Sequence, residues 1–339
     1  MFMVIFGAGA SYDSLASALP NGVSHGAKFS RPPLAKQLFW TDRYFAQWLD
    51  YFPECHPVIP YLQGADNLEH TLEALQEEAR TDSQRLRQIT ATRFYLQLMI
   101  ENCGNDWKSE TRGITNYVTL LDQLRRHRKP GDPVLLVTFN YDKMIEDALP
   151  SVGVAVDELS HYISDDAFKL FKLHGSVNWA HEVETEIPNL PERNPWDVAK
   201  ELIHRVADLQ ISNRYRMVVG QPISKVEDIP LFPAIAIPVE NKSGFECPSD
   251  HVDCLRAHLE MVTKILIVGW RATERHFLDL LRGAVTDKIP VQVVAGGRGP
   301  GEEVLSHFAA AGISVLGEAL DAGFSHYVLN RTAEQFFEM

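Results

Sequence analysis

The chain has 339 residues, enough for one large α/β domain or two smaller ones. Apolar residues make up 45% of it and charged residues 23%, which excludes a mainly disordered protein. With 32 basic and 45 acidic residues, the formal charge is -13. Because phosphate contacts need clustered Lys and Arg, this acidity argues against direct nucleic-acid binding. The compact basic segment 124–129 is typical of a solvated helix end before Pro130.

The apolar N-terminus, MFMVIFGAGAS, is too short to cross a membrane and follows no basic segment, so it predicts a first strand. Apolar runs of 18 or more residues are absent, and we expect a soluble protein without membrane contacts. The four cysteines, Cys55, Cys103, Cys247 and Cys254, form no C-x-x-C pair, so the sequence predicts no metal site. Scattered thiols fit a cytoplasmic location.

Apolar runs of strand length recur along the chain. They lie at 2–6, 134–138, 170–173, 234–239, 264–268 and 291–295. Several of them, such as VLLVTF and ILIVGW, show no alternation, which indicates strands buried on both faces of a parallel sheet. Helical patterns follow at 141–150, 274–283 and 301–312. This alternation predicts an α/β fold with a Rossmann-like, doubly wound parallel sheet.

Two long segments interrupt this pattern within what we expect to be one domain over 1–339. Apolar residues at helical spacing in 67–103 and 113–127 predict a helical lobe inserted at 30–115. Segment 182–233 contains several prolines and a helical pattern near 197–209. We expect an irregular insertion there, made of loops and helical turns that cover the site or meet a partner.

The first candidate for chemistry is the glycine loop that follows the first strand. Gly7, Ala8, Gly9 and Ser11 allow a tight turn and a close backbone approach to a phosphate at a helix start. The loop is not a complete dinucleotide motif, because Tyr12 stands where G-x-G-x-x-G requires glycine. A glycine turn packed for structural reasons is the alternative interpretation.

Polar side chains follow two further strands. Thr138, Asn140 and Asp142 come at the end of the second strand, and His174 follows the third. Strand ends in open α/β sheets face the ligand crevice, which makes these residues candidates for catalysis or binding. Taken singly, Asn140 or Asp142 could instead cap the next helix, and His174 could be a satisfied structural histidine.

The strand ends at 268–270 and 295–303 supply two more corners of the predicted crevice. The first contains Gly269 and Trp270, and the second contains Gly297 and Arg298, which can contact ribose or phosphate. These two loops are of a kind that binds nucleotides. Together with the polar residues Asn140, Asp142 and His174, they predict that a dinucleotide is bound and also chemically altered.

As a set, the motifs GAGAS, TFNYD, KLHGSVNW and ILIVGW resemble those of the Sir2-like family in order and spacing. Within that family the sequence resembles the bacterial branch associated with antiphage defence more than the protein deacylases. Deacylases usually carry a four-cysteine zinc module, T-Q-N-I-D in place of TFNYD, and G-T-S in place of GWR at 269–271. These departures count against acyl-lysine peptide chemistry.

The resemblance implies an enzyme that binds NAD as its substrate and hydrolyses the nicotinamide–ribose bond without a metal. It implies that Asn140 and His174 are catalytic and that Asp142 lies near the nicotinamide ribose. Gly7, Ala8, Gly9 and Ser11 would form the phosphate loop. Abortive infection by NAD depletion, a homo-oligomer and a HerA-type ATPase or another defence-system partner are further implications.

Two other functions are open at this point. One is a non-catalytic module that senses NAD or ADP-ribose and regulates a defence complex. The other is an NAD-dependent protein deacylase, for which the sequence offers no sign of a peptide groove.

Overall fold

A computed structural model describes residues 1–14, 31–39, 43–65, 67–220, 223–238, 244–285 and 288–338. The chain divides into two compact units. The first unit comprises Met1–Pro32, Gly104–Leu173 and Ser249–Met339, and the second comprises Pro33–Cys103 and His174–Pro248. Each unit therefore draws on segments that lie far apart in the sequence.

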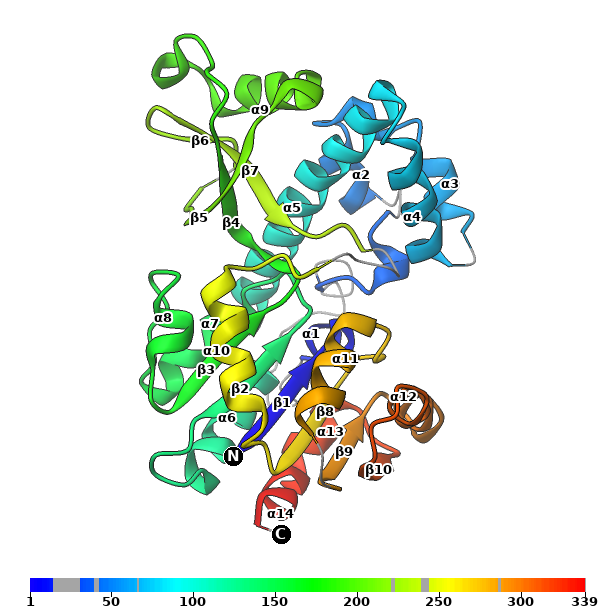
Figure 1. Cartoon of the computed structure of the whole chain (residues 1–339), viewed down its shortest axis with the longest axis vertical. Coiled ribbons are helices and arrows are strands. Elements are labelled where there is room, and N and C mark those ends of the chain that lie inside the picture. Colours follow the sequence, from blue (N-terminus) through cyan, green and yellow to red (C-terminus); the bar gives the residue numbers. More distant parts are fainter. Residues whose placement is uncertain are drawn as a thin grey trace. The chain divides into compact units, whose positions relative to one another are not determined.

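The first unit is built on a six-stranded parallel sheet. Its order is β10-β9-β8-β1-β2-β3, the order of a doubly wound dinucleotide-binding fold (Figure 1). The strands are β1 (Phe2–Phe6), β2 (Val134–Thr138), β3 (Phe168–Lys172), β8 (Lys264–Val268), β9 (Pro290–Val294) and β10 (Leu316–Leu320). Almost every side chain of β1, β2, β8 and β9 is buried, as continuous apolar strands require. The predicted fold class is confirmed.

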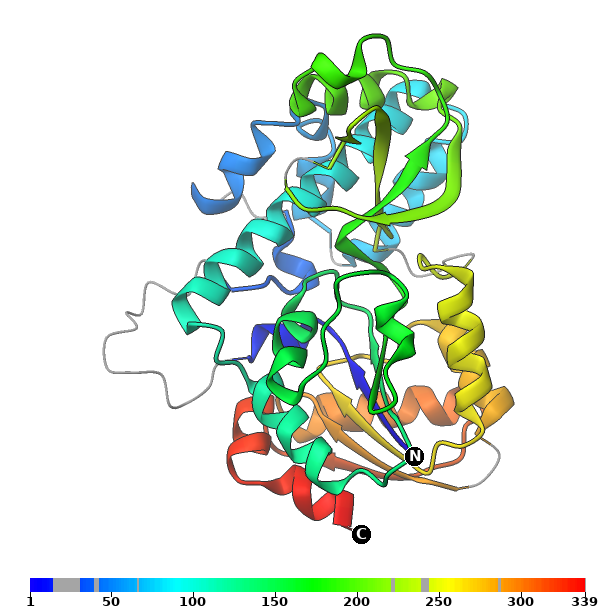
Figure 2. The same cartoon turned by 90° about the vertical axis from the view of Figure 1, so that its left-hand side faces the viewer.

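Helices cover both faces of this sheet. In Figure 2, α6, α13 and α14 run along one face, and α10 and α11 along the other. The helices are α1 (Ala8–Tyr12), α6 (Asn116–His127), α7 (Met144–Ala148), α8 (His161–Ser164), α10 (Ser249–Leu259), α11 (Arg275–Ala284), α12 (Arg298–Ala310), α13 (Phe324–Leu329) and α14 (Thr332–Glu338). The basic segment 124–129 lies at the end of α6, where Arg125 and Arg126 pair with Asp122.

The second unit combines helices with an antiparallel sheet of order β5-β4-β7-β6. Its helices are α2 (Arg43–Leu49), α3 (Ile59–Gln63), α4 (Leu68–Glu78), the greater part of α5 (Ser83–Thr111) and α9 (Pro195–His204). Its strands are β4 (Gly175–Val183), β5 (Ile211–Met217), β6 (Lys225–Val226) and β7 (Ile229–Ile235). The segment 30–115, where a helical lobe was expected, contributes α2, α3, α4 and the greater part of α5 to this unit.

The structure differs from the irregular insertion expected over 182–233, because that segment holds most of the antiparallel sheet and helix α9. Strand β5 is polar and largely exposed, so it lacks the apolar signal of a core strand. Strand β7 contains Pro230 and Pro233, and proline within a run argues against a central strand. The predicted run at 234–239 overlaps only the end of this antiparallel β7 and does not belong to the parallel sheet.

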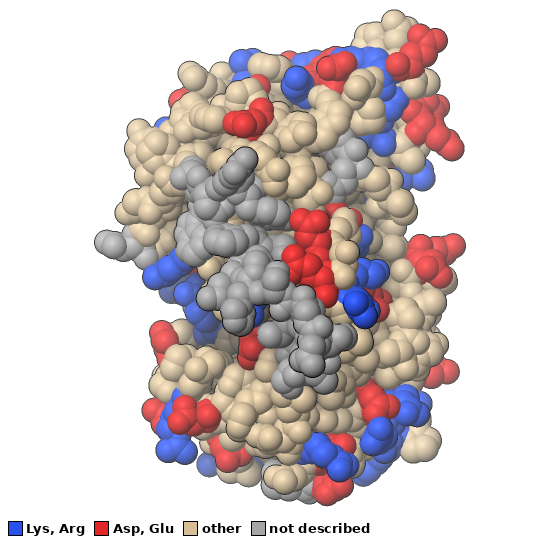
Figure 3. Space-filling view, turned by 180° about the vertical axis from the view of Figure 1, so that it is seen from behind, with Lys and Arg blue, Asp and Glu red and all other residues tan. Residues whose placement is uncertain are grey.

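Acidic and basic side chains are interspersed on the face drawn in Figure 3. Within the described part of the chain, no helix is long and apolar enough to cross a membrane.

Candidate functional site

The glycine loop after β1 packs directly against the loop after β8. The Gly7 N–H donates to the Val268 carbonyl at 3.0 Å, and the Gly9 N–H donates to the Gly269 carbonyl at 3.1 Å. Both loops leave the carboxyl ends of adjacent parallel strands, which is where open α/β sheets bind ligands. The structure thus brings together the two loops that were predicted separately from the sequence.

Close contact explains why glycine occupies these positions. A Cβ on Gly7 would lie 2.5 Å from the Gly269 carbonyl oxygen, and one on Gly9 would lie 2.8 Å from the Gly269 Cα. Gly269 itself has φ +61°, and its Cβ would collide with the backbone of Gly9 and Ala10. Packing of the two loops is therefore sufficient to explain why these positions are glycine. A close approach of a ligand to the loop is a separate proposal.

Asn140 lies beside this loop and is tied to it. Its Nδ2 donates to the Gly7 carbonyl at 2.9 Å and to the Ser11 hydroxyl at 3.0 Å, while its backbone N–H donates to Thr138 Oγ1 at 3.0 Å. Both amide N–H donors are used within the chain. Asn140 would therefore meet a ligand through its carbonyl oxygen Oδ1, as a hydrogen-bond acceptor.

Asp142 stands two residues further on and is also buried. Its Oδ1 accepts the backbone N–H of Met144 at 3.0 Å at the start of α7. Of the two predicted helix caps, Asp142 plays this role, whereas the Asn140 side chain is directed to the glycine loop. The capping bond uses one carboxylate oxygen, and a carboxylate has further acceptor capacity.

Tyr117 of α6 completes the hydrogen-bonded group, and sequence reasoning did not find it. Its hydroxyl lies 2.9 Å from the Ser11 hydroxyl, and the residue is 1% exposed. Burial raises the pKa of Tyr117 well above its usual value, and the nearby negative charge of Asp142 raises it further. The phenol therefore stays neutral, and its hydroxyl remains available for the hydrogen bond with Ser11. In the sequence it looks like one more apolar position of an amphipathic helix.

Lys172 and Glu146 were also missed. The Lys172 side chain is fully buried, and its Nζ lies 2.8 Å from Glu146 Oε1. Lys172 also donates to the backbone carbonyl of Asp142. Tyr162 donates to the same Glu146 oxygen at 3.1 Å. The available sequence signal was a lysine inside the apolar strand FKLFK, two residues before His174.

His174 is the first residue of the second segment of the second unit, His174–Pro248. Its predecessor, Leu173, donates its N–H to the Thr138 carbonyl at 3.1 Å, so the chain leaves β3 beside the end of β2. The His174 carbonyl accepts the N–H of Ala236 at 2.9 Å. Gly175 has φ +82°, and a Cβ there would lie 2.9 Å from the Ala234 carbonyl carbon, so close packing against Ala234 requires this glycine.

The remaining predicted binding residues lie at the ends of β8 and β9. The Trp270 ring is buried and stacks on Phe139 with centroids 5.1 Å apart, and its Nε1 donates to Glu274 at 2.6 Å. Its ring therefore belongs to an aromatic cluster, and its Cα and Cβ border Gly7. Gly297 precedes α12, and Arg298 is exposed at its first turn.

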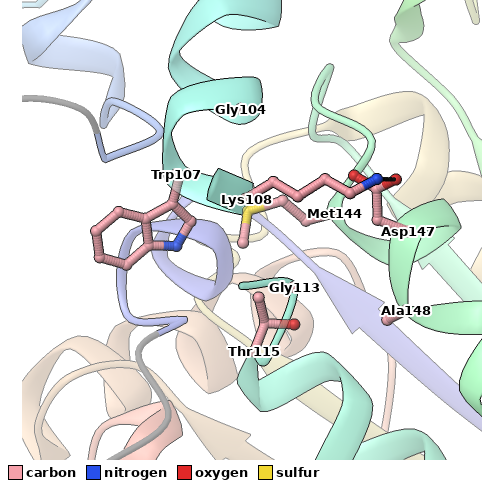
Figure 4. Close-up of a pocket in the computed structure, with 8 residues that line it drawn as sticks. All are labelled: Gly104, Trp107, Lys108, Gly113, Thr115, Met144, Asp147 and Ala148. Atoms are coloured by element: carbon pink, nitrogen blue, oxygen red, sulfur yellow. Dashed lines mark hydrogen bonds and ion pairs between the residues drawn. The ribbon is translucent and has the colours of Figure 1, made fainter. Parts of the chain in front are cut away.

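A small pocket lies between the end of α5, the start of α6 and α7 (Figure 4). Its lining residues are Gly104, Trp107, Lys108, Gly113, Thr115, Met144, Asp147 and Ala148. Two buried polar atoms of its lining residues, Trp107 Nε1 and Thr115 Oγ1, have no hydrogen-bond partner within the described part of the chain. Lys108 and Asp147 form an ion pair of 2.6 Å beside it.

Metal ligation finds no support in the described residues, because they contain no group of three or more His, Cys, Asp or Glu side chains able to hold an ion. The arrangement found instead is a buried amide, a hydroxyl pair and a carboxylate at one edge of the sheet.

No protein-family model matches the chain, and no curated protein matches it. Solved structures that resemble it include Sir2 proteins. Sir2Tm bound to a propionylated peptide is 13% identical with a TM-score of 0.42, over 99% of this chain and 93% of that chain. A Sir2 homologue mutant in complex with 2'-O-acetyl ADP ribose is also 13% identical, with a TM-score of 0.41, over 100% and 93%. Sir2 with a p53 peptide and NAD+ is 14% identical with a TM-score of 0.40, over 99% and 93%. Since these values are low, functional inference rests on the residues of this chain.

Proposed function

We propose that the protein is an NAD+ glycohydrolase that cleaves NAD to nicotinamide and ADP-ribose. The observation that carries the proposal is the bonding of Asn140 to both Gly7 and Ser11, with Asp142 two residues away. This group lies at the carboxyl ends of β1 and β2, next to the β1–β8 position where the strand order reverses. Dinucleotides bind at that switch point in doubly wound sheets.

The chemistry of the bond suits these side chains. Nicotinamide leaves NAD as a neutral molecule, so the leaving group needs no acid. Positive charge develops at the ribose carbon instead, as in glycoside hydrolysis. The Asp142 carboxylate would stabilise that charge electrostatically, in a buried setting where such an interaction is stronger than in water.

Asn140 and His174 would handle the nucleophile. Because the Asn140 N–H groups bind Gly7 and Ser11, its Oδ1 would accept a hydrogen bond from the attacking water or a ribose hydroxyl and so orient it. His174 would remove a proton from one of these two groups as a general base. We further propose that Gly7, Ala8, Gly9 and Ser11, with Thr138, Gly269, Trp270, Gly297 and Arg298, form the surroundings of NAD.

An NADase that was always active would deplete the cell that makes it. We therefore propose a repressed resting state, released by homo-oligomer assembly or by a partner such as a HerA-type ATPase, in an abortive-infection response. The second candidate is a non-catalytic module that senses NAD or ADP-ribose. The observation that favours it is the full use of the Asn140 amide donors within the chain, which suits holding a loop as well as catalysis.

The test is to incubate purified protein with NAD and to quantify nicotinamide and ADP-ribose over time. Asn140→Ala and His174→Ala are the test variants, and Asn330→Ala and His326→Ala, which change exposed residues at the end of α13, are matched controls. The assay is repeated with proteins encoded nearby and with an acyl-lysine peptide.

Turnover that only the two test variants abolish supports the glycohydrolase. ADP-ribose binding without turnover in any assembly state points to the sensing module. Nicotinamide release only when the peptide is present points to a deacylase, and each of these two results would exclude the first proposal.

A further inference from the structure

Lys172 and Glu146 form a buried ion pair. The pair contacts the segment 140–142, which contains the proposed catalytic residues Asn140 and Asp142. The Lys172 side chain is 0% exposed and that of Glu146 is 9% exposed. The ammonium group bonds to Glu146 Oε1 and to the backbone carbonyl of Asp142. Lys172 thus connects strand β3 to α7 and to Asp142, which lies two residues before that helix.

Burial makes this pair costly. Moving an ammonium and a carboxylate out of water carries a large desolvation penalty, and apolar side chains of similar volume often stabilise a fold at least as well. Glu146 Oε2 is buried and has no hydrogen-bond partner among the residues that the structure describes, so the pair is not fully compensated there. Burial raises the pKa of Glu146, whereas the charge and hydrogen bond of Lys172 lower it in part. Packing alone gives no reason for these charges.

The hydrogen bonds of residues 140–142 supply a reason for the buried Lys172–Glu146 pair. The Asn140 N–H is held by Thr138, the Asp142 carbonyl by Lys172, and the Asp142 carboxylate by the Met144 N–H. The carbonyl of Asp142 is the one of these three groups held by a side chain from another strand. Because Thr138 and Lys172 are register partners across β2 and β3, the lysine is set at the height where β2 ends.

We propose that Lys172, locked by Glu146, is a positioning residue that fixes the backbone of residues 140–142 and thereby aims the Asn140 and Asp142 side chains. The consequence for catalysis rests on the proposed NAD hydrolysis, whereas the consequence for the backbone does not. Lys172 touches no reacting atom in this proposal. Its loss should therefore lower turnover more than substrate binding.

The test compares two lysines that pair with adjacent carboxylates of α7. Lys172→Met removes the buried partner of Glu146, and the control Lys108→Met removes the exposed partner of Asp147 (Figure 4). The double variant Lys172→Met/Glu146→Gln removes the unpaired buried charge that Lys172→Met leaves behind. The readouts are hydrogen exchange of amides 140–144, measured by mass spectrometry on the full chain, and kcat and KM for NAD.

For Lys172→Met and the double variant we expect exchange at 140–144 to accelerate roughly tenfold or more. We expect kcat to fall roughly 10- to 100-fold while KM changes less than about threefold. Lys108→Met should leave both readouts near wild type.

Several results would overturn the proposal. Unchanged exchange at 140–144 in both Lys172 variants would do so, as would an equal effect of Lys108→Met. If neither Lys172 variant folds, the pair serves folding alone and the positioning role is wrong. If wild type fails to cleave NAD in every state, the proposed function fails, and exchange at 140–144 still decides the positioning role.

Discussion

Replacing Gly269 with alanine should damage the loop pair that holds the candidate site. An alanine at φ +61° adopts the left-handed conformation, which costs about 1–2 kcal/mol. Its Cβ would also collide with the Ala10 nitrogen and lie 2.6 Å from the Gly9 Cα. These are backbone atoms, which cannot rotate away, so overpacking adds about 1–3 kcal/mol.

Gly153 offers a matched control in the same unit. It has φ +85°, and a Cβ there would meet nothing within 4 Å. Gly153→Ala should therefore carry the conformational cost of about 1–2 kcal/mol alone. The difference between the two variants isolates the cost of pushing the β8 loop away from the glycine loop.

The assay is urea unfolding of both variants, together with ADP-ribose binding by calorimetry. We expect Gly269→Ala to be less stable than Gly153→Ala by about 1–3 kcal/mol and to bind ADP-ribose at least about tenfold more weakly. A stability gap below about 0.5 kcal/mol would refute the reasoning, because it would show that the loops separate at no cost.

Two further predictions concern hydroxyl and carboxyl groups. Tyr117→Phe removes the bond to Ser11 and should cost about 1 kcal/mol in urea unfolding and lower NAD turnover, whereas unchanged values would show that the hydroxyl is idle. For Glu246, burial acts to raise the pKa, but the hydrogen bond from His181, the charge of Arg93 and the hydrogen bond from Tyr215 lower it below the usual 4.5. A carboxylate with a lowered folded pKa stabilises the fold above its unfolded pKa and loses that contribution as pH falls through the folded pKa. The stability lost in Glu246→Gln should therefore be full at pH 7 and shrink below about pH 4.5, and a loss independent of pH would contradict this.

The parallel sheet could be predicted because its central strands are buried on both faces. Burial on both sides forces continuous apolar runs, so β1, β2 and β8 were predicted within the bounds found. Strand β10, with the sequence LGEAL, lies at the edge of the sheet and is largely exposed. It carries no such run and could not be found in this way.

The antiparallel sheet failed to show in the sequence for a related reason. Strand β4 mixes Asn178, His181 and Glu182 with apolar residues, because its polar side chains find partners within the fold. His181 Nε2 lies 2.6 Å from Glu246, and Glu182 pairs with Arg214 at 2.7 Å. These partners are distant in sequence, so no local pattern reveals them.

The parts of the candidate site that follow from the parallel strand topology could be predicted. The contacts that depend on the register between β2 and β3 could not. Asn140 and the glycine loop could be placed together because parallel strands present their carboxyl ends at one edge. The contact of Lys172 with Asp142 depends on Lys172 facing the end of β2, which is set by the pairing of Lys172 with Thr138. Tyr117 reaches Ser11 only because α6 packs over this part of the sheet.

The structural and functional interpretations of the glycine loop support each other. Because the N–H of Gly9 bonds to Gly269 and that of Ala10 to Gly7, these two donors are not available to a phosphate. A dinucleotide would have to meet the loop through its other groups, with the Ser11 hydroxyl held between Asn140 and Tyr117. The same bonds fix the Asn140 amide so that Oδ1 remains as its acceptor. The packing that makes glycine necessary at 7, 9 and 269 therefore also fixes the orientation on which the proposed hydrolysis depends.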